Sequence, residues 1–133
     1  MSRVFADSFF FFAILNPHDA AHSRATDFAR RHRASLVTTA WVLTEAADGL
    51  ASTPRRHTFH RLLEDLENNR SNLIVPTNEE MFEKGIELYH ARPDKQWSLT
   101  DCISFVVMSE ERLTDALTGD RHFEQAGFSA LLK

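Results

Sequence analysis

The stretch Arg3-Val4-Phe5-Ala6-Asp7 decides the fold, because three apolar residues in a row come directly before a carboxylate. A short uninterrupted apolar run indicates a strand that is buried on both faces, as in a parallel sheet covered by helices. Asp7 then stands at the carboxyl end of this strand. In open α/β sheets these strand ends lie on one edge, and ligands bind there.

Strand-like and helix-like segments alternate along the rest of the chain. Strands are expected at residues 3–7, 35–39, 72–75, 116–118 and 128–131. Helices are expected at residues 8–15, 19–32, 42–51, 54–68, 78–91 and 98–112, with a helical turn around Phe123. This alternation predicts one α/β domain over residues 1–133, in which a mainly parallel central sheet is flanked by helices on both faces.

The composition indicates a soluble globular protein, with 43% hydrophobic and 26% charged residues. A net charge of −4 argues weakly against a surface built entirely for nucleic acid, although local basic segments decide that question. The single cysteine, Cys102, excludes an internal disulfide and a multi-cysteine zinc site. We interpret it as a small buried apolar residue.

The apolar run Phe9-Phe10-Phe11-Phe12-Ala13-Ile14-Leu15 is too short to span a bilayer, which needs ~20 residues. It also lacks the basic start and cleavage site of a secretory signal, so we expect a cytoplasmic protein. Four adjacent aromatic residues on a short helix cannot all face inward. The run therefore predicts an exposed aromatic surface that another chain covers.

Four acidic residues stand where the chain leaves a strand or begins a helix: Asp7, Glu45, Asp101 and Asp120. Each has an ordinary explanation, since Asp7 and Asp101 can cap helices and Asp120 lies in a turn. Glu45 lies in a largely apolar segment, where a carboxylate is costly unless it is paired or bound to a metal. Four carboxylates at one sheet edge repel one another unless a divalent cation holds them, so the set predicts a hard-metal site.

Four segments, taken in order, resemble the PIN-domain nucleases and specifically the VapC-type toxins of bacterial toxin–antitoxin pairs. They are Val4-Phe5-Ala6-Asp7-Ser8, Leu43-Thr44-Glu45, Asp94-Lys95-Gln96-Trp97-Ser98-Leu99-Thr100-Asp101-Cys102, and Ala116-Leu117-Thr118-Gly119-Asp120-Arg121-His122-Phe123 with Ala126-Gly127-Phe128. The resemblance covers nearly the whole chain, and its order and spacing carry more weight than any single segment. It implies a PIN-like three-layer fold.

The resemblance also implies an activity, namely the hydrolysis of RNA phosphodiester bonds with one or two Mg²⁺ or Mn²⁺ ions. Asp7 and Asp101 would be the best direct metal ligands. Glu45 and Asp120 would complete the site, either through waters or by binding a second ion, and Glu45 could instead deprotonate the attacking water. The implied partners are an RNA substrate (tRNA, rRNA or mRNA), a second copy of the chain, and a cognate antitoxin in a hydrophobic groove leading to the acids.

Several polar residues near the acids have two interpretations each. Ser8, Thr100 and Thr118 either orient the carboxylates or act only as caps and strand ends. His122 either touches a substrate phosphate or packs beside Asp120. Asp115 comes before its strand, at the opposite end from Asp120, and is therefore not assigned to the site.

Basic residues cluster in Arg30-Arg31-His32-Arg33 and in Arg55-Arg56-His57, the latter with His60 and Arg61 nearby. Such clusters either hold a phosphate backbone or form solvated helix faces.

Other protein classes with a strand-end aspartate fit less well. A phosphatase of the haloacid-dehalogenase type needs a second Asp two residues after the first, where this chain has Phe9. A phospho-accepting receiver domain needs a lysine at a strand end, and Lys84, Lys95 and Lys133 are not at the end of an expected strand. The alternative that stays open is a non-catalytic PIN-like module that binds RNA or protein, although retention of all four acids argues against it.

Overall fold

The computed structural model describes residues 2–133 and shows a parallel sheet within them. Its strands are β1 (Arg3–Ala6), β2 (Ser35–Thr39), β3 (Leu73–Val75), β4 (Asp115–Leu117) and β5 (Ser129–Ala130). They lie in the order β3-β2-β1-β4-β5, and every neighbouring pair is parallel. The prediction of a mainly parallel sheet is confirmed.

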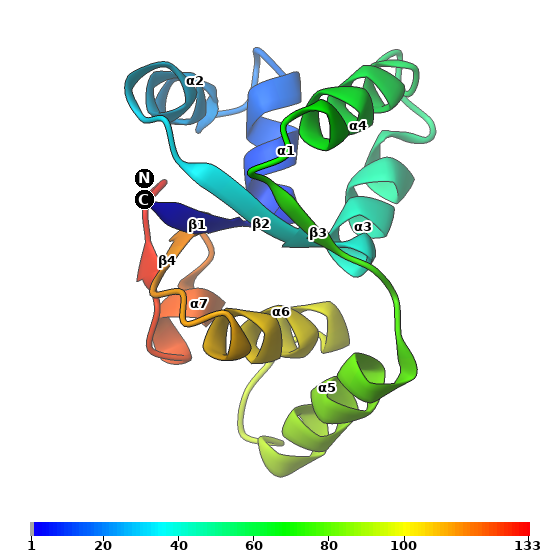
Figure 1. Cartoon of the computed structure of the whole chain (residues 1–133), viewed down its shortest axis with the longest axis vertical. Coiled ribbons are helices and arrows are strands. Elements are labelled where there is room, and N and C mark those ends of the chain that lie inside the picture. Colours follow the sequence, from blue (N-terminus) through cyan, green and yellow to red (C-terminus); the bar gives the residue numbers. More distant parts are fainter. Residues whose placement is uncertain (1) are drawn as a thin grey trace.

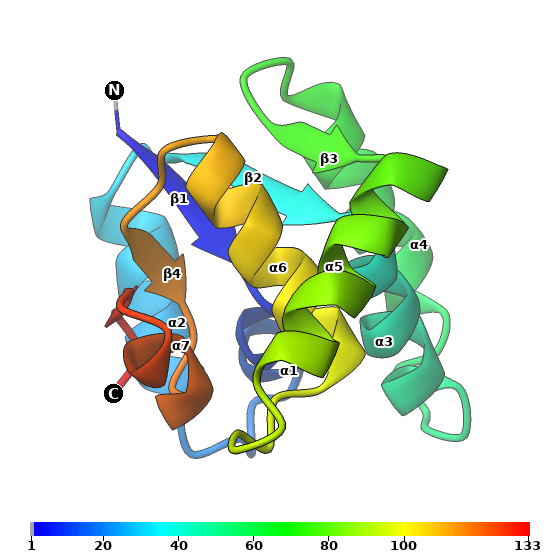
Figure 2. The ribbon, with the colours of Figure 1, turned by 90° about the horizontal axis from the view of Figure 1, so that it is seen from below.

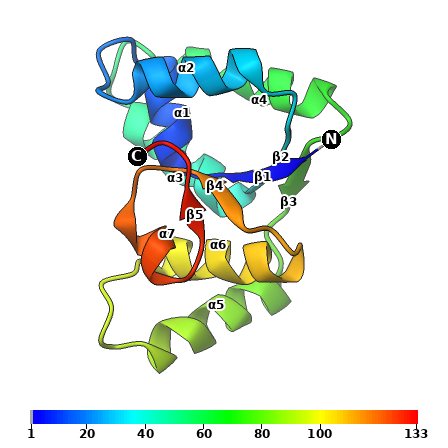
Figure 3. The ribbon, with the colours of Figure 1, turned by 90° about the vertical axis from the view of Figure 1, so that its left-hand side faces the viewer.

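Helices cover both faces of this sheet, which gives three layers (Figures 1 and 3). The helices are α1 (Ser8–Leu15), α2 (His22–Arg31), α3 (Ala40–Leu50), α4 (Thr58–Asn68), α5 (Glu79–Ala91), α6 (Leu99–Glu110) and α7 (Arg121–Gln125). Helices α1, α2 and α4 lie on one face, and α5, α6 and α7 lie on the other. Figure 2 shows α6 between α5 and β4, with α5 in the outer position.

The first strand is buried because it lies in the middle of the sheet. Phe5 pairs with Val37 of β2 on one side and with Ala116 of β4 on the other. Phe5 and Ala6 are fully buried, as expected for an apolar strand with helices above and below. Asp7 follows directly and begins α1, so the central strand delivers it to the carboxyl edge of the sheet.

The aromatic run on α1 does not form an exposed surface, so that prediction is wrong. Two of the four rings, Phe10 and Phe11, are buried in the core. The other two pack against glycines, where a Cβ would lie only 2.6 Å from the Phe9 ring at Gly119 and 2.5 Å from the Phe12 ring at Gly49. Within residues 2–133, the exposed large apolar side chains belong to Leu73, Phe82, Tyr89 and Leu131.

Local side chains set several helix boundaries. Asn78 and Ser98 cap α5 and α6 by accepting hydrogen bonds from backbone N–H groups three residues on. Helix α2 begins later than expected, because Asn16 and Asp19 accept hydrogen bonds from backbone N–H groups two residues on and hold residues 16–21 in turns. No helix within the described residues is long and apolar enough to cross a membrane.

Candidate metal centre

The four acids predicted to form the site lie at the carboxyl edge of the sheet, each on a different element. Asp7 is the N-cap residue of α1 directly after β1, and Asp120 is the N-cap residue of α7, three residues after the end of β4. Glu45 lies on α3, which follows β2 without a loop, and Asp101 lies in the first turn of α6. Hydrogen bonds through three neighbouring side chains, Ser8, Thr118 and His122, link them into one cluster.

Asp7 is the buried member of the cluster, with only 6% of its surface exposed. The pKa of its carboxyl is raised from 3.8 to about 7, mainly by burial and to a smaller extent by the nearby carboxylates of Asp101 and Glu45. Hydrogen bonds from the Thr118 hydroxyl and from the Ser8 backbone oppose this shift in pKa. Without a cation, the charged form of Asp7 is therefore disfavoured at the position where it is held.

A single hydroxyl connects Asp7 with Asp120. Thr118 Oγ1 donates to Asp7 Oδ2 at 2.9 Å and accepts from the backbone N–H of Asp120 at 3.1 Å. Thr118 is fully buried, so this bridge is shielded from water. The end of β4 thus fixes the first acid and the start of the turn that carries the fourth.

Asp101 is held by two contacts at the start of α6. Its Oδ2 accepts from the backbone N–H of Ser98 at 3.1 Å, while Ser98 Oγ accepts from the backbone N–H of Asp101, which is a reciprocal capping box. The same oxygen lies 3.1 Å from His122 Nδ1, which is 3.5 Å from Asp120 Oδ1. One ligand atom from each of Asp101, Asp120 and His122 can be chosen so that all three lie within 4.8 Å of one another.

Glu45 differs from the expectation of an apolar environment. Leu43 and Ala46 are buried, but Glu45 itself is on the exposed side of α3. Its Oε1 accepts a hydrogen bond from Ser8 Oγ at 2.5 Å, so the residue after Asp7 orients it. Glu45 is therefore open to solvent at the edge of the cluster.

Of the other polar residues near the acids in the sequence, some contact the acid cluster and others do not. The hydrogen bonds expected from Ser8 and Thr118 to the acids are present, whereas Thr100 makes no such bond within residues 2–133. Asp115 begins β4 and so lies at the far end of the strand from Asp120. The contact of His122 with Asp101 was not foreseen, because 21 positions separate them and no local pattern signals the pairing.

The cluster fits a hard divalent cation. In the described part of the chain, no lysine or arginine forms an ion pair with any of the four acids, and the only basic partner is His122. The donors are mainly carboxylate oxygens, which Mg²⁺ and Mn²⁺ prefer. A cation there would offset both the mutual repulsion of the carboxylates and the cost of burying Asp7.

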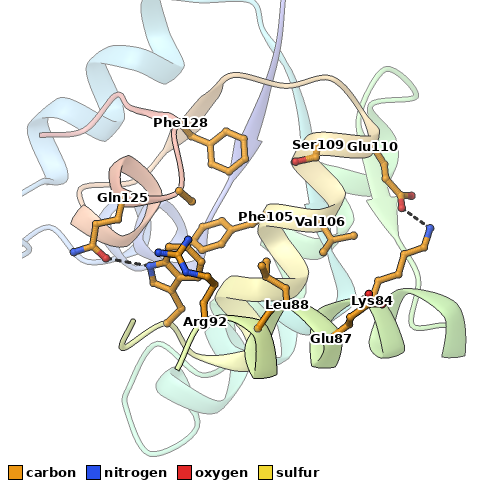
Figure 4. Close-up of a pocket in the computed structure, with 13 residues that line it drawn as sticks. Lys84, Glu87, Leu88, Arg92, Phe105, Val106, Ser109, Glu110, Gln125 and Phe128 are labelled. Carbon is orange, nitrogen blue, oxygen red and sulfur yellow. Dashed lines mark hydrogen bonds and ion pairs between the residues drawn. The ribbon is translucent and has the colours of Figure 1, made fainter. Parts of the chain in front are cut away.

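Two cavities lie away from the acid cluster. One, of about 600 Å³, lies between α5, α6 and α7 and has Leu88, Phe105 and Phe128 in its lining (Figure 4). Another, of about 570 Å³, lies between α3 and α4 and has Leu43 and Phe59 in its lining. None of the four acids lines either cavity, so the acid cluster lies outside both of them.

Comparisons with known proteins agree with this architecture. The crystal structure of Mycobacterium tuberculosis VapC20, described as a sarcin-ricin loop cleaving toxin, matches with a TM-score of 0.83 at 22% identity, covering 94% of this chain and 95% of that one. FitAcB from Neisseria gonorrhoeae matches with a TM-score of 0.68 at 16% identity, covering 96% of this chain and 94% of that one. No curated protein sequence matches. The family model of the PIN domain matches residues 4–129, and the chain therefore belongs to the PIN domain family.

Proposed function

We propose that this chain is an Mg²⁺- or Mn²⁺-dependent endoribonuclease that acts as the toxin of a toxin–antitoxin pair. The observation that carries the proposal is the group of four carboxylates at one sheet edge without a lysine or arginine partner in residues 2–133. Membership of the PIN domain family and the fold shared with the toxin VapC20 support it. We propose that residues 1–133 act as one PIN domain, in the cytoplasm.

Asp7 and Asp101 are the proposed direct ligands, and Glu45 and Asp120 complete the metal site. The cation, when bound, supplies Lewis acidity, which activates water and stabilises negative charge on the phosphate oxygens. In the alternative role of Glu45, its carboxylate would accept a proton from the attacking water, and its exposure and its hydrogen bond from Ser8 support this role. The remaining contacts, from Thr118 and His122, hold the other three acids in position.

One of the two basic segments lies on the same edge as the acids. Arg55, Arg56 and His57 belong to the connection between α3 and α4, and α4 runs back to the start of β3, so that its own beginning lies toward the carboxyl edge. The segment 30–33 instead joins the end of α2 to the start of β2, which is the opposite edge of the sheet. We therefore propose that the connection around Arg55 faces the RNA and that the segment 30–33 is a solvated helix end.

Two apolar surfaces are available for protein partners. Leu43, Thr44 and Ala47, which are close to Glu45 on α3, line the cavity between α3 and α4. We propose this cavity as the groove for an antitoxin segment. Phe82 and Tyr89 are the exposed aromatics of α5, seven residues apart and therefore on one side of the helix. We propose this side of α5 as the contact with a second copy of the chain.

The test is cleavage of bacterial total RNA and of tRNA by the purified chain with Mg²⁺, Mn²⁺ or EDTA. Asp7→Asn and Asp101→Asn are the test variants, and Asp115→Asn is the matched control because Asp115 lies at the other end of β4. We expect discrete fragments from the wild type and the control, and none with EDTA or the two test variants. Equal cleavage by Asp7→Asn would contradict the site. Absence of both cleavage and metal binding by calorimetry would favour the non-catalytic module.

A further inference from the structure

A small cavity of about 290 Å³ lies beside the acid cluster. Its lining residues are Asp94, Lys95, Gln96, Arg121, His122 and Gln125. His122 belongs to both places, because its Nδ1 faces Asp101 and Asp120 while its side chain also lines the cavity. A ligand in the cavity would therefore lie next to a ligand bound at the acid cluster.

The lining of the cavity holds more basic than acidic side chains, although the whole chain has a net charge of −4. The one acid in the lining, Asp94, is already neutralised, since Arg92 Nε and Nη2 donate to its two oxygens at 3.0 and 2.9 Å. Lys95 and Arg121, in contrast, form no ion pair with any residue from 2 to 133, and Arg121 is exposed. Two cationic side chains are thus free to bind an anion.

The remaining lining adds hydrogen-bond donors. Gln125 Oε1 accepts from the indole N–H of Trp97 at 3.1 Å, which fixes the orientation of the amide. Its NH₂ group is then the part that can serve a ligand. A guanidinium, an ammonium and an amide NH₂ are all donors, and this combination recognises the oxygens of a phosphate.

We propose that this cavity binds a backbone phosphate of the RNA adjacent to the phosphate at the acid cluster. The inference rests on the proposed nuclease function and deepens it, because it names where an acidic protein holds a polyanionic strand. Carboxylates repel RNA wherever a cation does not screen them, so a positive cavity next to them keeps the strand in register. An RNA strand has phosphates on both sides of the cut, whereas an acidic peptide has no reason to continue into the carboxylate cluster.

The test variant is Lys95→Gln/Arg121→Gln, and its matched control is Arg31→Gln/Arg33→Gln, which removes the same charge from exposed residues at the opposite sheet edge. An RNA fragment that the wild type cuts is the substrate. We expect the test variant to raise KM roughly 10-fold with kcat unchanged, because a charge-assisted interaction made equally in the ground and transition states is removed. The slope of log(1/KM) against log[KCl], which is negative, should become less negative by about 0.7 if the strand has one neutralised phosphate fewer. The control should match the wild type.

A second measurement does not depend on cleavage. Inorganic phosphate is titrated into the chain, and the NMR signal of the Gln125 side-chain amide is followed. Saturable shifts in the wild type and in the control, and their absence in the test variant, support the phosphate site even where no RNA is cut, which would overturn only the nuclease proposal. Unchanged KM and unchanged phosphate shifts in the test variant would overturn the site while leaving the nuclease intact. Displacement of phosphate by an acidic peptide but not by RNA would overturn it in favour of a protein partner.

Discussion

The two halves of the acid cluster are built in opposite ways. Asp7 is 6% exposed, follows the central strand and is held by the fully buried hydroxyl of Thr118. The other half consists of Asp101, His122 and Asp120, whose side chains are 14%, 20% and 36% exposed and lie at helix starts. The core of the protein positions the first half, and short-range caps position the second.

The difference in burial between the two halves means that one half carries the electrostatic cost of the site and the other half gives access to it. Burial makes the charge of Asp7 costly until a cation arrives, which is why its pKa is raised to about 7. The more exposed half is the side of the cluster that solvent, and therefore a phosphate, can reach. A buried anchor opposite an accessible rim suits a site that must hold a cation firmly and still admit a polymer.

The largest expected effect comes from Asp7→Asn, which should act in opposite directions on activity and stability. Loss of a direct ligand should lower RNA cleavage by roughly 10³-fold or more, corresponding to several kcal/mol of lost metal-ion stabilisation. The folded pKa of about 7 lies above the unfolded value of 3.8, so the folded chain retains a proton that the unfolded chain releases between these values. The free energy of unfolding therefore falls as pH rises from about 4 to 7, by up to about 4 kcal/mol, and the variant avoids this loss.

Urea unfolding in EDTA at pH 4 and pH 8 measures the second effect. The variant should exceed the wild type in stability at pH 8 and match it at pH 4. If Asp7→Asn is less stable than the wild type at pH 8, then the charged Asp7 carboxylate does not lower the free energy of unfolding.

The next effect concerns the bridge between the two halves. Thr118→Val keeps the shape of the buried side chain but removes the donor to Asp7 and the acceptor for the Asp120 N–H. We expect Mn²⁺ affinity to fall about 10- to 100-fold by calorimetry, the range for removal of groups that support metal ligands. Thr118→Ser retains the hydroxyl and should restore most of the affinity, and equal losses in both variants would point to packing alone.

A smaller effect is expected in the accessible half. His122→Phe removes the ring nitrogen that faces Asp101 and Asp120, and should weaken Mn²⁺ binding by about 10-fold, the lower end of the range for such supporting groups. His122→Asn offers a side-chain amide near the same place and should recover part of the loss. An unchanged affinity in His122→Phe would mean that the capping box alone holds Asp101.

The smallest effect at the metal centre should come from Gly85→Ala, which tests stability away from the site. A Cβ at Gly85 would overlap with Ile103 Cγ1, so either the Ile103 side chain or the two helices must move. We expect the free energy of unfolding to fall by about 1–3 kcal/mol, typical of overpacking, with Mn²⁺ affinity unchanged. A parallel loss of Mn²⁺ affinity would show that the site depends on the packing of α5 against α6.

Local patterns in the sequence were sufficient for much of the fold. The bounds of α1 and β2, Ser8–Leu15 and Ser35–Thr39, agree with the expected ones, because apolar runs and breakers mark their ends. The class of sheet follows from the alternation of elements. The strand order, with β1 in the middle, depends on contacts between distant segments and was not predicted.

The errors arose where distant residues decide the environment. The run Phe9–Phe12 looked too aromatic to bury, but Gly49 and Gly119 provide the space for its outer rings. Glu45 looked buried from its neighbours, although its own direction on α3 is toward solvent. The positive cavity at Lys95 and Arg121 joins two segments that no motif links, so its charge became visible only in three dimensions.

The hydrogen bond between Thr118 and Asp7 spans 111 positions of sequence, and this has a consequence for synthesis on the ribosome. The chain grows from its amino end, so Asp7, Ser8 and Glu45 exist long before β4 does. Until β4 emerges and inserts beside β1, neither the bridge to Asp7 nor the turn that carries Asp120 can form. A nascent chain therefore lacks a complete site, and a nuclease built this way cannot attack the RNA of the ribosome that is making it until β4 has emerged and paired with β1.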